Sequence, residues 1–280
     1  GPVLEIFGAI TVGAVAGAEV GTAGPGDEVV AAGMPGPGGV LPIIDGRNAV
    51  TRPGLSFFNE DRSVIQVGGL RGTAAAPSNI VIENLEIRSA RAPYTFRDSE
   101  GNTAEYKAIA SAIRFVDCDG VVVRNCTIRD TGNGTISSPG TRNITIEGCH
   151  YFDNGMEGKN GVGVHQTYTE TMGMIYQFNY FGLLREGCTG SNLKDRSSGN
   201  VIRYNWIEGG NKQIDIPDSY DSEETRSDPR YRETFIYGNI LIEPEGDGNP
   251  EMVTYGGDMG DESRYRKGTL YFYNNTIVSE

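Results

Sequence analysis

The sequence lacks any uninterrupted apolar run close to the roughly 20 residues needed to cross a bilayer, because Asn or Gly interrupts its apolar stretches every few positions. A transmembrane helix is therefore excluded. The sequence also has little that supports long helices, since 40 of its 280 residues are Gly, which is unfavourable inside a helix. Coiled coils and helical bundles are excluded, and a turn-rich all-β chain is favoured.

Basic residues and metal-binding side chains are also scarce. The chain has 24 Lys and Arg against 37 Asp and Glu, which gives a net charge of −13. This charge repels a polyanion unless the basic residues gather in one place, so we expect no nucleic-acid partner. With only two His and no CxxC pair, a zinc site is not expected.

Four cysteines are present: Cys118, Cys126, Cys149 and Cys188. Cys126 and Cys149 occupy equivalent places in two similar phrases, RNCTI and IEGCHY. This favours buried free thiols that stack on one another, with a disulfide as the alternative.

A short phrase recurs seven times after residue 78. It consists of two apolar residues in alternation, a polar or Gly step, usually an Asn, and another apolar residue. The seven copies are NIVIENLEI (79–87), GVVVRNCTI (120–128), NITIEGCHY (143–151), GMIYQFNYF (173–181), NVIRYNWI (200–207), TFIYGNIL (234–241) and TLYFYNNTI (269–277). The alternation predicts a half-buried strand, and the Asn favours a left-handed turn and a stack of amides. Each phrase therefore predicts one corner of a coil.

The spacing of these phrases selects the architecture. Their last residues lie between 23 and 41 positions apart: Ile87, Ile128, Tyr151, Phe181, Ile207, Leu241 and Ile277. A minimum near 23 with variable excess fits a parallel β-helix, in which each rung has fixed strands and one loop of free length. A propeller needs about four antiparallel strands per 40 to 50 residues, and leucine-rich repeats need a Leu ladder.

From about residue 62 to residue 280, the chain resembles the right-handed parallel β-helix proteins of the pectate-lyase-like superfamily. The resemblance implies an all-β, right-handed parallel β-helix, a fold shared by lyases, hydrolases, epimerases and phage adhesins. The Gly- and Pro-rich residues 1–61 are expected to form an irregular N-terminal cap or entry rungs. Because residue 280 falls inside a strand phrase, we expect the coil of 62–280 to be truncated at its C-terminus, or covered there by a partner.

Two cations lie two positions apart in this acidic chain. Strand alternation predicts that Asn192, Lys194 and Arg196 share one face. Such a patch can pin the carboxylate of a sugar. The alternative is a solvated surface network in which the two cations pair with nearby acids. Those acids are Asp195, Glu186 and Asp215.

This stretch is similar to the β-helix alginate lyases and chondroitinase-B-like lyases, in which a catalytic Lys precedes an Asn-turn strand and an Arg follows about one rung later. Lys194 matches the Lys, but one rung later the chain reads QIDIPD (213–218), without an Arg. Arg196 or Tyr204 is then the candidate acid. A Lys crowded by another cation has a lowered pKa and can act as a base.

The resemblance therefore implies β-elimination on a uronic-acid polysaccharide, which needs a cation for the carboxylate, a base and an acid. Lys194 is the candidate base or carboxylate clamp, and Arg196 and Arg203 are candidate binders of anionic groups. His165 and Tyr168 lie one or two rungs earlier, so we expect them in the same groove as Lys194. For His165 the alternative is a purely structural role.

Asp215, Asp218 and Asp221 form a second constellation. Paired carboxylates suit Ca²⁺, which lyases of this superfamily often use, or acid and base work in a β-helix glycosidase. Turn capping is the alternative.

A glycoside hydrolase and a non-catalytic glycan-binding or adhesion module thus remain as rival functions. The expected partner is an acidic polysaccharide, with the protein secreted, periplasmic or at the cell surface; the sequence does not indicate its oligomeric state.

Overall fold

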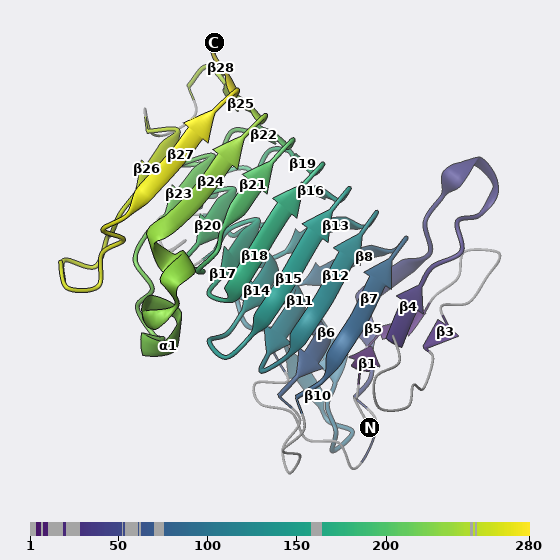
Figure 1. The fold of residues 1–280 in the computed structure, drawn as a ribbon. Helices are drawn as coiled ribbons and strands as arrows, with labels where there is room; N and C mark the ends of the chain where they lie inside the picture. Colours follow the sequence, from purple (N-terminus) through teal and green to yellow (C-terminus); the bar gives the residue numbers. More distant parts are fainter. Residues whose placement is uncertain are drawn as a thin grey trace.

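The structure of the chain is a computed structural model. It describes the segments 4–6, 8–10, 19–20, 29–51, 53, 61, 63–69, 76–157, 164–246, 249 and 251–280. Almost all regular structure in these residues is β, in three sheets that run along one axis (Figure 1). None of the described helices is long and apolar enough to span a membrane.

Each turn of the coil contributes one strand to each of the three sheets. Sheet A contains β1 (Leu4–Ile6), β6 (Ser63–Gly68), β11 (Ser111–Val116), β14 (Asn133–Ser137), β17 (Thr167–Thr169), β20 (Leu193–Asp195), β23 (Ile214–Ile216) and β26 (Val253–Tyr255). Sheet B contains β2 (Gly8–Ile10), β5 (Ile43–Ala49), β8 (Glu86–Ala90), β13 (Thr127–Thr131), β16 (His150–Phe152), β19 (Tyr180–Phe181), β22 (Trp206–Glu208), β25 (Ile240–Glu243) and β28 (Thr276–Ser279). Sheet C contains β3 (Glu19–Val20), β4 (Val29–Ala32), β7 (Ser78–Glu83), β12 (Asp119–Arg124), β15 (Arg142–Glu147), β18 (Met172–Gln177), β21 (Val201–Arg203), β24 (Glu233–Tyr237) and β27 (Thr269–Tyr273).

Neighbouring strands along the axis pair in parallel from β4 onward. The chain is therefore a right-handed parallel β-helix, as the phrases predicted. Only β1, β2 and β3 pair antiparallel with the first rungs. The parallel ladder thus reaches back to residues 29–49, inside the segment predicted as cap or entry rungs (1–61), of which slightly less than half lies outside the described residues.

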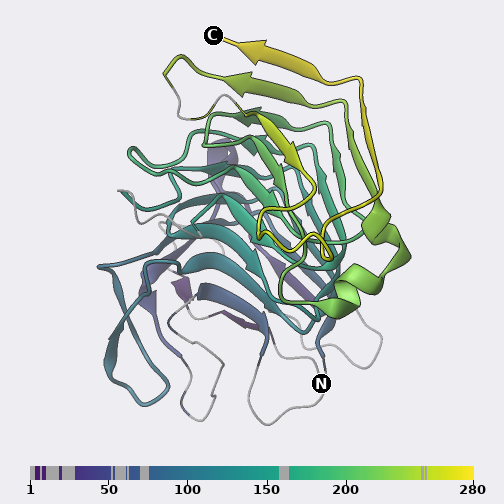
Figure 2. The same cartoon turned by 90° about the vertical axis from the view of Figure 1, so that its left-hand side faces the viewer.

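Two elements project from the coil rather than extending it. The hairpin of β9 (Thr95–Arg97) and β10 (Thr103–Glu105) is one of them. The helix α1 (Glu223–Ser227) is the other, and it lies in the connection between β23 and β24 (Figure 2). Ser222 caps α1, since its side chain accepts a bond from the Thr225 amide. This connection is the free loop of its rung, and it reaches the site described below.

The sequence predicted that a single Asn makes the left-handed turn and also stacks its amide at each corner. In the structure, two consecutive residues at the corner between sheets C and B divide these two roles. The first residue of each corner has a positive φ, which Asn and Gly tolerate best. These residues are Asn84, Asn125, Gly148, Phe178, Tyr204, Gly238 and Asn274. The next residue points inward, and from the fourth corner it is an Asn whose amide bonds the next rung. The left-handed turn and the amide stack therefore belong to different residues.

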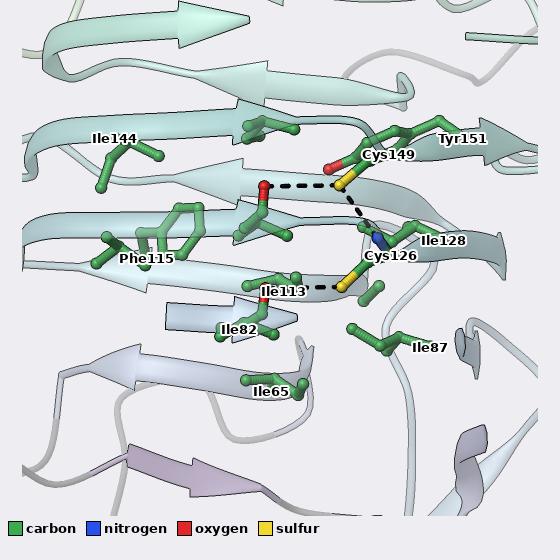
Figure 3. Close-up of a cluster of buried hydrophobic side chains, with 14 of the residues drawn as sticks. Ile65, Ile82, Ile87, Ile113, Phe115, Cys126, Ile128, Ile144, Cys149 and Tyr151 are labelled. Atoms are coloured by element: carbon green, nitrogen blue, oxygen red, sulfur yellow. Dashed lines mark hydrogen bonds between the residues drawn. The ribbon is translucent and has the colours of Figure 1, made fainter. Parts of the chain in front are cut away.

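The interior is a set of stacked apolar columns. Ile65 and Ile113 are fully buried and paired on adjacent rungs of sheet A (Figure 3). Cys126 and Cys149 occupy inward corner positions one rung apart, where the Cys126 amide donates to the Cys149 sulfur at 3.4 Å. All four cysteines are free thiols, and Cys188 alone is not fully buried. The predicted stack of buried thiols is thus confirmed for Cys126 and Cys149.

Candidate active site

A column of polar side chains crosses the outer face of sheet A. The strand register places Tyr168 beside Lys194, Lys194 beside Asp215, and Asp215 beside Thr254. Strand alternation explains this column, because the neighbouring Leu193 is completely buried in the core. Residues up to 86 positions apart in the chain, from 168 to 254, therefore lie on four successive rungs.

Lys194 is held between two carboxylates. Its Nζ lies 2.8 Å from Asp215 Oδ2 and 3.0 Å from Asp258 Oδ2. Burial alone would lower the pKa of Lys194, but Asp215 and Asp258 together raise it above its usual value. The predicted lowering of this pKa is wrong, because the nearest charges are acids. Lys194 is therefore a firmly protonated cation, and its predicted pairing with Asp215 is confirmed.

Arg196 extends the same cluster and is almost completely buried, with 4% of its side chain exposed. Its Nη2 lies 3.2 Å and 3.1 Å from the two carboxylate oxygens of Asp258. Its Nε donates to the Tyr168 hydroxyl at 3.2 Å, and its Nη1 donates to the Asp218 carbonyl. Lys194, Arg196 and Tyr168 thus form one wall, as predicted.

His165 lies beside this wall as a neutral, buried side chain. Its Nδ1 accepts a bond from the Ser191 amide at 2.9 Å, so the neutral ring carries its proton on Nε2. Burial, followed by the charge of Lys194, lowers the pKa of His165 to about 3. Its ring meets that of Tyr168 edge-on at 5.4 Å. His165 therefore has a structural role through Nδ1, which accepts the Ser191 amide, while its ring borders the predicted groove.

Glu170 is a site residue that the sequence reasoning missed. It is 4% exposed, and three donors converge on its Oε1: the Ser219 hydroxyl at 2.5 Å, the Ser222 amide at 3.1 Å and the Asp221 amide at 3.2 Å. Burial raises the pKa of Glu170 above its usual value, and the charge of Asp221 acts in the same direction. A buried carboxyl with a raised pKa is typical of a general acid.

A pocket of about 230 Å³ opens beside Glu170. Its lining includes Tyr168, Glu170, Asp221, Arg114, Ile136 and Pro139. Tyr168 and Glu170 lie two positions apart, in and directly after β17. Asp221 lies in the connection between β23 and β24 that contains α1. The alternation of HQTYTE (165–170) was the available signal that relates Glu170 to Tyr168. Asp221 lies 51 positions after Glu170, and no local pattern connects these two residues.

Three predicted site residues are not brought to this wall. Asn192 is fully buried, and its Nδ2 donates to the carbonyls of Glu208 and Gly209. Arg203 lies on β21 in sheet C, where it bonds Gln177 and the Tyr237 hydroxyl. Tyr204 follows it at the corner between sheets C and B and is 49% exposed. The predicted basic patch therefore does not include Arg203.

Asp215 and Asp218 have partners other than a metal. Asp215 accepts bonds from Lys194 and, at 2.7 Å, from the Thr254 hydroxyl. Asp218 Oδ1 accepts the Asp258 amide at 2.8 Å. Within the described residues, no group of three or more His, Cys, Asp or Glu side chains is placed to hold a metal ion. An ammonium group already lies against the Asp215 carboxylate, while Asp218 Oδ2 is buried without a hydrogen-bond partner among the described residues. Ca²⁺ at these two residues therefore stays a prediction.

Comparisons with known proteins concern the coil. The sequence model described as "Right handed beta helix region" matches residues 48–181. The match and the parallel sheets agree on a right-handed β-helix. No curated protein matches the chain.

Two solved structures are similar to the chain, and both are of DFA-IIIase from Arthrobacter chlorophenolicus A6. The complex with DFA-III has a TM-score of 0.37 and 12% identity, and the alignment covers 81% of this chain and 60% of that one. The complex with GF2 has a TM-score of 0.30 and 10% identity, and covers 78% and 58%. The chain thus spans about 60% of the length of these structures.

Proposed function

We propose that the protein is a carbohydrate-active enzyme that cleaves an acidic polysaccharide on the outer face of sheet A, with Glu170 as the proton donor. The observation that carries the proposal is the buried Glu170 carboxyl, with its raised pKa, on the wall of a pocket. Cleavage of a glycosidic bond needs a proton on the leaving oxygen. A carboxyl whose pKa is raised by burial is suited to supply it.

Hydrolysis is the reaction that this geometry supports best. It requires a second carboxylate to activate water or to attack the sugar, and Asp221 lines the same pocket. Three donors fix Oε1 of Glu170, which orients the carboxyl. Tyr168, Lys194 and Arg196 then bind hydroxyl and anionic groups of the neighbouring sugar units. Asp221 is one of the three carboxylates that the sequence suggested for this role, and it lines the pocket, whereas Asp215 and Asp218 are engaged elsewhere.

β-Elimination is the second candidate function. The observation that favours it is the pair of cations, Lys194 and Arg196, which converge on one carboxylate. Neutralising a uronate carboxylate in this way assists removal of the C5 proton. Lys194 is then a clamp and not the base, because its pKa is raised.

The test is a product screen on alginate, pectate, ulvan and glycosaminoglycans, with the wild type and the variant Glu170→Gln. We expect the wild type to release reducing ends without unsaturated sugar, and the variant to lose about a hundredfold to ten-thousandfold in rate. Glu233→Gln is the matched control, since Glu233 is exposed on sheet C. Unsaturated products would establish the lyase instead. Equal rates for Glu170→Gln and Glu233→Gln would remove Glu170 from the mechanism.

A further inference from the structure

A carboxylate of the chain itself lies on the proposed active-site wall. Asp258 belongs to the loop after β26, and its Oδ2 lies 3.0 Å from Lys194 Nζ and 3.1 Å from Arg196 Nη2. The two cations are mostly buried, with 15% and 4% of their side chains exposed, whereas Asp258 is 35% exposed. The cations thus belong to the sheet, and the acid covers them from the solvent side.

The two cations depend on Asp258 unequally. Lys194 has a second carboxylate partner in Asp215. Among the ion pairs of the described residues, Asp258 is the carboxylate that pairs with Arg196, whose other bonds go to the Tyr168 hydroxyl and the Asp218 carbonyl. A buried guanidinium without an anionic partner is strongly unfavourable. Arg196 therefore requires one carboxylate partner, which either the protein or a bound ligand can supply.

The Asp258 side chain can leave without moving the main chain of its loop. Asp218 Oδ1 accepts the amides of both Asp258 and Met259, which holds the loop backbone in place. Rotation of the Asp258 side chain toward solvent therefore breaks only its bonds to Lys194 and Arg196. A Cβ built on Gly256 or Gly260 would have nothing within 4 Å, whereas one on Gly257 would overlap the Tyr265 ring. The loop is therefore packed beside Asp258 on one side, and the Asp258 side chain itself is 35% exposed.

From these contacts we infer that Lys194 and Arg196 form a carboxylate-binding subsite, and that Asp258 is its internal occupant, which a ligand carboxylate displaces. The inference rests on the proposed function only for the nature of the ligand, an acidic glycan. Asp258 compensates the two cations when no ligand is bound. In doing so it competes with the ligand. The apparent affinity is the intrinsic affinity multiplied by the fraction of time for which Asp258 leaves the subsite free.

The experiment measures binding and not cleavage, so its outcome is independent of the role of Glu170. Calorimetric titrations use trimers of galacturonate and of mannuronate and a hyaluronan tetrasaccharide as acidic probes, with maltotriose as the neutral probe. We expect Asp258→Asn to bind at least one acidic probe about tenfold or more tightly than the wild type does. The affinity for maltotriose should not change. Asp258→Ala should behave in the same way, which guards against a misfolded single variant.

Glu262→Gln is the matched control, because it removes the same charge from an exposed position of the same loop. It should leave all affinities at the wild-type values. The inference is overturned if neither Asp258 variant gains affinity for any acidic probe over Glu262→Gln. It is also overturned if maltotriose gains as much as the acidic probes, since the loop would then act only by obstructing the groove. A protein that binds acidic probes in this way but cleaves nothing would uphold the subsite and refute the proposed enzyme.

Discussion

His165 and Glu170 are both buried, and burial favours the neutral form of each. For His165 the neutral form is the unprotonated ring, so the pKa falls; for Glu170 it is the protonated acid, so the pKa rises. The two side chains therefore make stability depend on pH with opposite signs.

His165 should make the protein sensitive to acid. Its pKa is about 6.5 when unfolded and about 3 when folded, so between these values the unfolded state binds a proton that the native state does not. Stability therefore falls as the pH is lowered through this window, by on the order of 4 kcal/mol for this group. His165→Asn keeps an acceptor for the Ser191 amide and removes the titration.

The measurement is urea unfolding of the wild type and His165→Asn at pH 7 and pH 4. The variant should lose clearly less free energy of unfolding between these two values than the wild type loses. Carboxylates with lowered pKa, such as Asp215, contribute equally to both proteins and cancel in the comparison. An identical loss in the two proteins would show that His165 titrates normally in the fold.

Glu170 should have the opposite effect. Its folded pKa lies above its unfolded value, so the stability it contributes is complete at low pH and is lost as the pH rises toward the folded pKa. Gln at this position still accepts bonds at Oε1 and does not ionise. Glu170→Gln should therefore equal the wild type in stability at acid pH and exceed it at neutral pH, as measured by chemical unfolding. A variant that is less stable at neutral pH would contradict the raised pKa.

At the scale of the element, the corners carry the predictable part of the fold. Alternation and an Asn or Gly step identified all seven corners, because one side chain in two must face the core and a left-handed turn admits few residue types. Phe178 and Tyr204 take this left-handed position against the usual preference, so the rule assigned the turn to the Asn that follows each of them. Tertiary stacking overrode the local preference there.

The Asn column itself should be a large contributor to stability. Asn205 Oδ1 accepts the Asn179 amide at 3.0 Å, and its Nδ2 bonds the Tyr176 carbonyl and Asn239. Asn205→Ala leaves these buried groups without partners, and we expect a loss of about 3 kcal/mol in the free energy of unfolding. Thr276→Ala, on an exposed position of β28, is the control. A loss below about 0.5 kcal/mol would mean that the column is not a structural support.

At the scale of the whole molecule, the coil brings the site residues together from several rungs, and no single segment of the chain contains the site. The sequence reasoning found Tyr168, Lys194 and Arg196 because they lie on, or directly after, strands whose alternation can be recognised in the sequence. It missed Glu170 because the alternation of HQTYTE (165–170) relates Glu170 to Tyr168 but does not mark it as buried. It did not predict the contact between Asp258 and Arg196, because the two residues lie 62 positions apart and no periodicity encodes the path of the loop that carries Asp258. The free loops of the rungs thus supply Asp221 and Asp258, whereas Lys194 and Asp215 come from strands of sheet A.

The most direct test of the account is a crystal structure of Glu170→Gln soaked with the longest acidic oligosaccharide that the wild type degrades. We predict that the glycan lies along the outer face of sheet A, with a glycosidic oxygen within hydrogen-bond distance of residue 170 and a carboxylate between Lys194 and Arg196. A glycan bound on sheet B or sheet C, with the pocket beside residue 170 free of sugar, would contradict it.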